Sequence, residues 1–166
     1  MPPVRPAPFL LLAVFVAGCG ATDVREAQRL FEAEAFTLPA SGFTETPDGV
    51  TVRDEDPQDW RIAPRFLGDF ELTLPPYPNP VGRGESIQLL GTFADRNGAL
   101  IPYRLTRDGD LLRIEGACVS GSTLAPAPVY TVFADCIGLG ESGLFRLVLL
   151  DGRGDVVTYG DVSVAR

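Results

Sequence analysis

The side chains that could do chemistry in this 166-residue chain are carboxylates, hydroxyls and three cysteines, because histidine and lysine are both absent. Without them the chain lacks Schiff-base chemistry, activation of a serine or cysteine by histidine, and histidine ligation of metals. The acidic residues show no spacing that selects two of them as the acid and base of a hydrolase. We therefore expect no catalytic residues and no cofactor, and a protein that is not an enzyme.

The first of the cysteines, Cys19, ends a segment with the features of a secretion signal. Arg5 supplies a positive charge, and residues 7–17 form an apolar stretch interrupted only by Pro8. Eleven helical residues span about 16 Å, which is too short for a hydrocarbon core of about 30 Å. Residues 1–18 are therefore predicted to be a signal peptide and not a transmembrane helix.

The run Val16-Ala17-Gly18-Cys19 resembles the lipobox of bacterial lipoproteins. The resemblance implies cleavage before Cys19 and attachment of lipid to its thiol. Several acyl chains together anchor a protein durably, where one does not. Gly20 follows, and not the aspartate that retains enterobacterial lipoproteins at the inner membrane. The expected location is thus the cell envelope, at the outer membrane. The sequence does not select between its periplasmic and its cell-surface leaflet. The alternative is an ordinary secretory signal that contains a cysteine.

If Cys19 carries lipid, Cys118 and Cys136 remain as a pair in an oxidising compartment, and we expect a disulfide between them. It would join the ends of the Gly- and Pro-rich connection over residues 119–128. The alternatives are two buried free thiols or half of a metal site. A zinc site has too few ligands here, because there is no histidine and no third thiolate, so no metal is predicted.

Four carboxylates and the only tryptophan lie close together between residues 54 and 60. Calcium binds such oxygens, but the EF-hand pattern is not met, and a solvated spacer is the favoured interpretation. Trp60 could offer a binding aromatic. We favour an anchor at the edge of the core, beside Ile62 and Phe66.

The tripeptide Arg153-Gly154-Asp155 matches an integrin-binding motif. Glycine and aspartate are also expected there for backbone reasons, because the tripeptide falls in a hairpin turn. We interpret it as turn chemistry.

The net charge of the chain is −8, and it becomes −9 without Arg5. Such a charge repels nucleic acid and anionic lipid surfaces. No nucleic-acid partner is therefore expected.

Apolar spacing and a capping box at Asp23 and Glu26 predict a short helix over residues 23–36. Its polar face carries both signs of charge, so packing on its own domain is favoured over binding to a membrane surface or a partner. Residues 37–65 are rich in proline, glycine and acidic residues, which predicts an extended spacer.

From residue 68 the apolar period changes to two, which is typical of strands. Turn signals such as Asp108-Gly109 and Asp151-Gly152 separate about seven runs. The continuous apolar runs at residues 89–90, 111–112 and 147–150 predict strands that are covered on both faces. The fold class is therefore all-β, an antiparallel immunoglobulin-like sandwich with a short N-terminal helix and an extended linker. The predicted strands are residues 70–74, 86–93, 100–107, 110–115, 129–134, 143–150 and 156–164.

Tyr77, Pro78, Asn79 and Pro80 resemble the Tyr-Pro-Asn-Pro element that opens the C-terminal sorting domains of type IX secretion cargo. Those domains end in a Gly-aromatic strand, a hairpin and a basic terminus, an order that is matched by residues 143–166. The resemblance covers residues 75–166 and implies a β-sandwich of Bacteroidota- or Rhodothermota-like lineage. A C-terminal sorting signal and a lipid anchor are alternative export routes. Given the lipobox, we interpret the resemblance as shared fold and lineage with these sorting domains, and not as evidence that the protein is secretion cargo.

The expected organisation has three parts: a lipoprotein signal peptide (1–18), an anchor, helix and tether (19–67), and a β-sandwich domain (68–166). The expected function is that of a lipid-anchored envelope protein acting as a binding or scaffolding module. Its expected partners are the membrane, through the lipid, and an unidentified envelope protein or glycan. The alternative is a type IX secretion cargo or sorting-like protein.

Overall fold

The computed structural model describes residues 20–40, 42–53, 56–94, 99–122 and 129–166. The signal segment, Cys19, the carboxylates at positions 54 and 55, and the sequence Asn97-Gly98 lie outside these ranges. Within them, neither helix has the length and apolar character that crossing a membrane requires.

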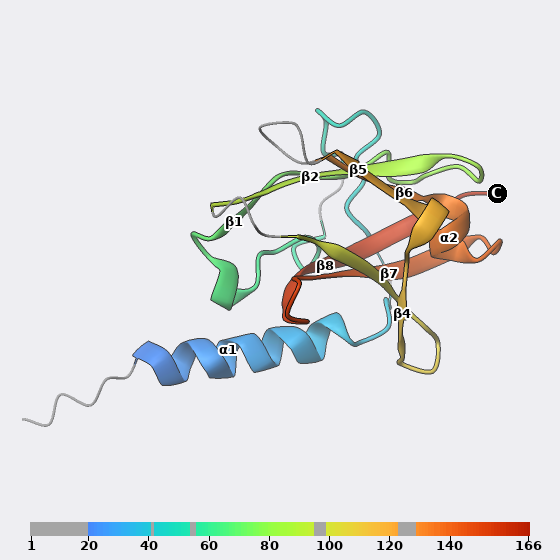
Figure 1. Ribbon diagram of the computed structural model, residues 1–166. Helices are drawn as coiled ribbons and strands as arrows, with labels where there is room; N and C mark the ends of the chain where they lie inside the picture. Colours follow the sequence, from blue (N-terminus) through green and yellow to red (C-terminus); the bar gives the residue numbers. More distant parts are fainter. Residues whose placement is uncertain (1–19, 41, 54–55, 95–98, 123–128) are drawn as a thin grey trace, which may run out of the picture.

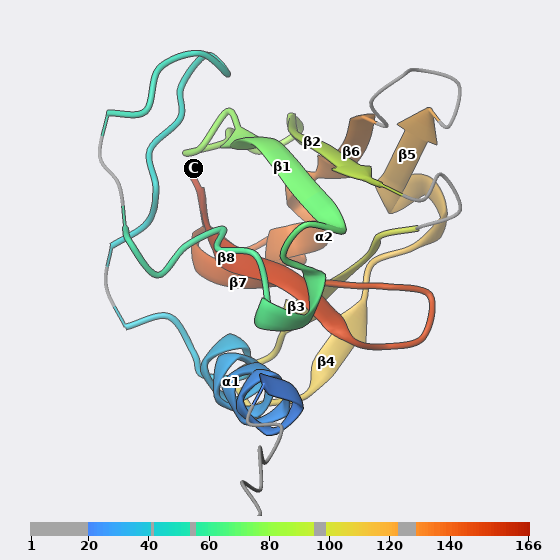
Figure 2. The ribbon, with the colours of Figure 1, turned by 90° about the vertical axis from the view of Figure 1, so that its left-hand side faces the viewer.

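Two four-stranded antiparallel sheets form a sandwich (Figures 1 and 2), which confirms the predicted all-β class. The first sheet has the order β1-β2-β6-β5 and the second has the order β4-β3-β7-β8. The bounds are β1 Phe70–Tyr77, β2 Ser86–Phe93, β3 Ile101–Leu105, β4 Leu111–Arg113, β5 Val119–Ser122, β6 Val129–Phe133, β7 Gly143–Leu150 and β8 Val156–Val164. Short helical turns connect some of them: η1 Pro64–Phe66, η2 Gly116–Cys118 and α2 Ala134–Gly138.

All seven predicted strands are present, and β5 is an additional one. The prediction for residues 111–112 is wrong in one respect, because β4 is an edge strand and Leu112 is exposed. In β7, by contrast, Leu147–Leu150 are all buried, as a strand covered on both faces requires. Buried side chains of both sheets, among them Ile87, Val132 and Leu149, belong to one apolar cluster.

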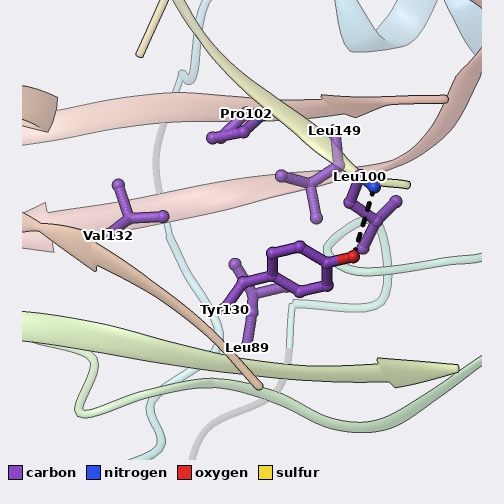
Figure 3. Close-up of a pocket in the computed structure, with 6 residues that line it drawn as sticks. All are labelled: Leu89, Leu100, Pro102, Tyr130, Val132 and Leu149. Carbon is purple, nitrogen blue, oxygen red and sulfur yellow. Dashed lines mark hydrogen bonds between the residues drawn. The ribbon is translucent and has the colours of Figure 1, made fainter. Parts of the chain in front are cut away.

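The interior of the sandwich includes a small apolar gap between the sheets (Figure 3), which the ring of Tyr130 enters from β6. Its walls are side-chain carbon, and the Tyr130 hydroxyl accepts a hydrogen bond from the Leu100 N–H at 3.4 Å. The gap has no room for a water-sized group. It is therefore a packing defect of the core with no place for a ligand. Its lining residues are Leu89, Leu100, Pro102, Tyr130, Val132 and Leu149.

The N-terminal helix α1 runs over Gly20–Ala35 and lies along the outer face of the β7–β8 pair (Figure 2). Phe31 and Ala35 are buried against the sandwich, whereas Leu30 is half exposed. The ring centroids of Phe31 and Tyr159 are 4.9 Å apart. The predicted helix is therefore present, and it packs on its own domain as favoured. It begins at Gly20, however, so Asp23 lies inside the helix and the predicted capping box is wrong.

The prediction of an extended spacer over residues 37–65 is wrong for most of the described part. Trp60 N–H donates to Tyr159 O at 2.7 Å, and Ala63 N–H donates to Val157 O at 2.8 Å. These bonds cover the outer edge of β8, a sheet edge that would otherwise expose unpaired backbone groups. Thr44, Trp60, Ala63 and Phe66 are buried. The described part of residues 44–66 therefore belongs to the folded domain, where part of this segment pairs with the edge of β8.

Candidate functional site

The predicted disulfide is present. Cys118 lies at the end of η2 and Cys136 in α2, with their Cα atoms 5.8 Å apart. Between them β5 and β6 pair as neighbouring strands, with Val119 opposite Val132. The bridge therefore joins the two ends of a strand pair, and not only the ends of a loop as expected. It is a structural bond at one end of the sandwich.

The Tyr77–Pro80 motif lies where β1 ends, and its central residue is Asn79. Both X-Pro peptide bonds, Tyr77–Pro78 and Asn79–Pro80, are cis. The Asn79 side chain is fully buried: its Nδ2 donates to Thr44 O and Asp161 O at 2.9 Å, and its Oδ1 accepts from Ser163 N–H at 2.9 Å. One amide thus joins the N-terminal segment to β8.

A buried ion pair lies beside this amide, between neighbouring positions of β7 and β8. Arg146 donates from Nε to Asp161 Oδ1 at 2.7 Å and from Nη2 to Asp161 Oδ2 at 2.8 Å. Both side chains are almost inaccessible to solvent. The two residues are direct cross-strand partners in the β7–β8 register. This bidentate geometry is the strong form of a guanidinium–carboxylate pair.

A second buried carboxylate, Asp59, bonds to the backbone around this pair. Its Oδ2 accepts from Thr44 N–H at 2.8 Å and its Oδ1 accepts from Asp161 N–H at 2.9 Å. Burial, together with the nearby Asp161 carboxylate, raises the pKa of Asp59 to about 7. Burial also raises the pKa of Asp161, although the Arg146 guanidinium opposes that shift.

The cluster continues to the surface through the C-terminal turn of α1. Arg146 Nη1 donates to Glu34 O at 2.9 Å, and its guanidinium lies 4.9 Å from the centroid of the Tyr159 ring. The Tyr159 hydroxyl donates to Glu34 Oε2 at 3.0 Å and accepts from Arg61 Nη2 at 2.8 Å. Arg61 also pairs with Glu34, and this contact lowers the pKa of the Glu34 carboxyl.

The hydrogen bonds of this cluster hold four segments together: the end of α1, residues 44–59, β7 and β8. Every charged member has a partner, and no described cavity reaches Asp59 or Asp161. Among the described residues there is also no group of three or more carboxylate or thiol ligands that could hold a metal. The cluster was missed at the sequence level. Its one signal is a charged residue in each of two apolar strands, at positions 146 and 161, and these become partners only once the register is known.

The described surface has a groove at the C-terminal end of β3, near Leu105. It has a volume of about 340 Å³, and its floor includes Phe145, over whose ring the Arg104 guanidinium lies at 5.8 Å. Arg104 Nη1 donates to Ile137 O, while its buried Nε has no hydrogen-bond partner among the described residues. The full lining is Arg104, Leu105, Thr106, Arg107, Asp108, Leu139, Glu141 and Phe145.

The rim of this groove carries an unusual apolar residue, Leu139. It follows α2 with φ of +48°, a left-handed conformation that costs a residue with a Cβ about 1–2 kcal/mol. Its side chain is 58% exposed. Leu139 is the C-cap of α2, where the left-handed conformation ends the helix and the Leu139 N–H bonds the Asp135 carbonyl. Its exposed side chain contributes to the lining of the groove. Across the rim, Arg107 pairs with Glu141 at 3.3 Å.

Two further sequence interpretations are confirmed. Trp60 is buried, and its ring packs so closely on β8 that a Cβ at position 160 would come within 2.3 Å of it, which explains Gly160. Arg153–Asp155 falls in the β7–β8 turn, where the Asp155 carboxylate pairs with Arg65 at 2.6 Å. The solvated-spacer interpretation is wrong for Asp59, which is buried for the reasons given above.

No protein-family model, curated protein or solved structure matches this chain with significance.

Proposed function

We propose that this protein is a lipoprotein of the cell envelope, held at the outer membrane by lipid on Cys19, whose sandwich is a non-catalytic binding or scaffolding module. The anchor rests on the Val16-Ala17-Gly18-Cys19 run and the short apolar stretch before it. The binding role rests on one observation, the groove between Arg104 and Leu139.

The lining of the groove combines two guanidinium groups with the exposed side chain of Leu139 and the ring of Phe145. Guanidinium donors recognise carboxylate and carbonyl oxygens, and an apolar neighbour adds buried area. The lining also holds the Asp108 and Glu141 carboxylates, so the groove presents both signs of charge beside its apolar side chains. A peptide segment of another envelope protein offers both carbonyl acceptors and N–H donors to such a lining. The charged clusters elsewhere are occupied in holding the fold.

Metabolic labelling with a palmitate analogue tests the anchor. The wild-type chain should incorporate label and fractionate with the envelope, and Cys19→Ser should do neither. Label that persists in Cys19→Ser would contradict the proposal. Unlabelled protein released into the medium would favour the alternative, a secretion cargo of type IX kind.

Site-specific photo-crosslinking in native envelopes tests the groove. A crosslinker in place of Leu139 should yield one defined adduct. The matched control is a crosslinker in place of Leu67, which is 68% exposed at the other end of the sandwich. Equal adduct yields from both positions would show that the groove is not the binding site.

A further inference from the structure

The first turns of α1 extend beyond the sandwich (Figure 1). Asp23, Val24, Arg25 and Glu26 are all exposed, although four consecutive residues cover every face of a helix. The first contact with the domain comes at Ala27 and Gln28. The described helix already includes Gly20, the residue directly after Cys19 in the sequence.

Two sets of contacts fix the direction of α1 on the sandwich. In its middle, Gln28 Nε2 donates to Val156 O at 3.1 Å, and Gln28 Oε1 accepts from Arg65 N–H at 3.2 Å. Near its end, Glu34 receives the bonds from Arg146 and Tyr159 described above. A rod held at two points about 9 Å apart cannot swing on its support.

These contacts also orient the whole domain. The earlier helix residue bonds Val156 and the later one bonds Tyr159, so α1 runs parallel to β8. The N-terminus of α1 and the β7–β8 turn therefore point to the same end of the molecule. The groove, α2 and the β3–β4 turn lie at the other end (Figure 1).

We propose that α1 is a rigid stand-off between membrane and domain, which sets the β7–β8 turn towards the membrane and the groove away from it. This proposal rests on the proposed lipidation of Cys19. From Gly20 to Gln28 the helix rises by about 12 Å. The headgroup layer on each side of a bilayer is about 5–8 Å thick. The overhanging turns are thus long enough to carry the domain clear of the headgroups.

An upright helix is favoured over one lying flat on the membrane. A helix that lies in the interface needs an apolar face and a basic polar face. The four exposed residues 23–26 comprise two acidic residues, one basic residue and a single apolar one, Val24. The acidic domain behind it is also repelled from anionic lipid. The partner of the groove is consequently a component that approaches from the side away from this membrane, and not a lipid headgroup.

Energy transfer to the membrane surface tests this orientation. The lipidated chain is reconstituted into phosphatidylethanolamine–phosphatidylglycerol vesicles that contain a rhodamine-headgroup lipid. A donor dye is attached either at Arg153→Cys in the β7–β8 turn or at Asp108→Cys beside the groove. Since β8 alone is about 30 Å long, transfer should be at least about twofold stronger from position 153 than from position 108. Equal transfer, or stronger transfer from position 108, would overturn the proposal.

A helix-breaking variant separates rigidity from mere proximity. Arg25→Pro removes a backbone hydrogen bond of the overhang at a position that touches nothing in the domain. It should bring the ratio of the two transfers towards one, whereas the matched Arg25→Ala should leave the ratio unchanged. An unchanged ratio in Arg25→Pro would overturn the stand-off. Failure of the lipid anchor itself would appear differently, as wild-type protein that does not incorporate into vesicles.

Discussion

At the scale of single residues, the buried Asn79 shows why a secretion-like motif has a structural role in this molecule. Its amide donates two hydrogen bonds and accepts one, and its backbone exchanges two more with Thr46. All these partners are backbone groups of segments far apart in the sequence. A buried amide satisfied in this way specifies one arrangement of those segments.

We expect Asn79→Ala to lower the free energy of unfolding by about 3 kcal/mol or more, because it leaves two carbonyls and one N–H unpaired in the interior. Urea denaturation followed by tryptophan fluorescence measures this loss. The matched control is Gln88→Ala, which removes one exposed hydrogen bond, to Tyr77, and should cost less than about 1 kcal/mol. Similar costs for the two variants would contradict a structural role for Asn79.

The buried carboxyl of Asp59 predicts that the protein becomes less stable as the pH rises from about 4 to about 7. Its pKa is about 7 in the folded state, whereas an unfolded aspartate has a pKa of about 3.9. Between these values the folded state binds more protons, so rising pH favours unfolding. The raised pKa of Asp161 acts in the same direction. Chemical denaturation at several pH values measures the slope.

Asp59→Asn should flatten this pH profile, because the side chain no longer ionises, at the cost of about one hydrogen bond. A smaller fall in stability with rising pH is still expected in this variant, because the pKa of Asp161 is also raised by burial. Asp110→Asn, at an exposed turn position, serves as the control and should leave the profile as in the wild type. A wild-type profile that is flat or rises over this pH range would refute the assignment.

At the scale of elements, docking of α1 depends on one face of the helix. Phe31→Ala removes the ring that packs on Tyr159 and should lower the free energy of unfolding by about 3 kcal/mol. The neighbouring Leu30→Ala, on the half-exposed side, should cost less than about 1 kcal/mol. Hydrogen exchange of the α1 amides gives a second readout and should accelerate only in Phe31→Ala. Equal acceleration in both variants would contradict one-sided docking.

The elements that could be predicted are those with a local signal. Alternating apolar residues and Gly-containing turns located seven strands, and the helical spacing of apolar residues located α1. The capping box did not mark the start of α1, because the helix begins at Gly20 and Asp23 lies inside it. β5 was missed because its sequence, Val-Ser-Gly-Ser, has almost no apolar pattern and forms a strand only through pairing with β6. The prediction of a spacer over residues 37–65 was wrong because proline and acidic content report only how well a segment is solvated by itself, and not what it packs against. This segment covers the exposed edge of β8, and that requirement arises from the tertiary structure and not from the local sequence.

The candidate sites divide in the same way. The disulfide could be inferred by counting cysteines, which is independent of the fold. The Arg146–Asp161 pair could not, because 15 positions of sequence separate two residues that the β7–β8 register makes neighbours. The groove depends on the meeting of the β3–β4 turn with the segment after α2, at Leu139. No local pattern in either segment reports that meeting.

At the scale of the whole molecule, an acidic domain that needs to stay at a membrane must be held there by something other than its own surface. With a net charge of −8, the chain as a whole is repelled from an anionic bilayer. The N-terminal overhang likewise carries mixed charge. Under the proposed function, lipid on Cys19 therefore supplies the binding energy, and the stand-off supplies the geometry.

This division predicts that the unlipidated Cys19→Ser chain does not bind phosphatidylethanolamine–phosphatidylglycerol vesicles at any salt concentration. Lowering the ionic strength should not help, because weaker screening only strengthens repulsion between like charges. Flotation with vesicles at about 10 mM and 500 mM salt measures it, with the lipidated wild type as the positive control. Binding of Cys19→Ser that grows as salt falls would reveal a basic contact surface and contradict the division of roles. Binding that grows with salt would instead indicate an apolar contact, and would equally contradict it.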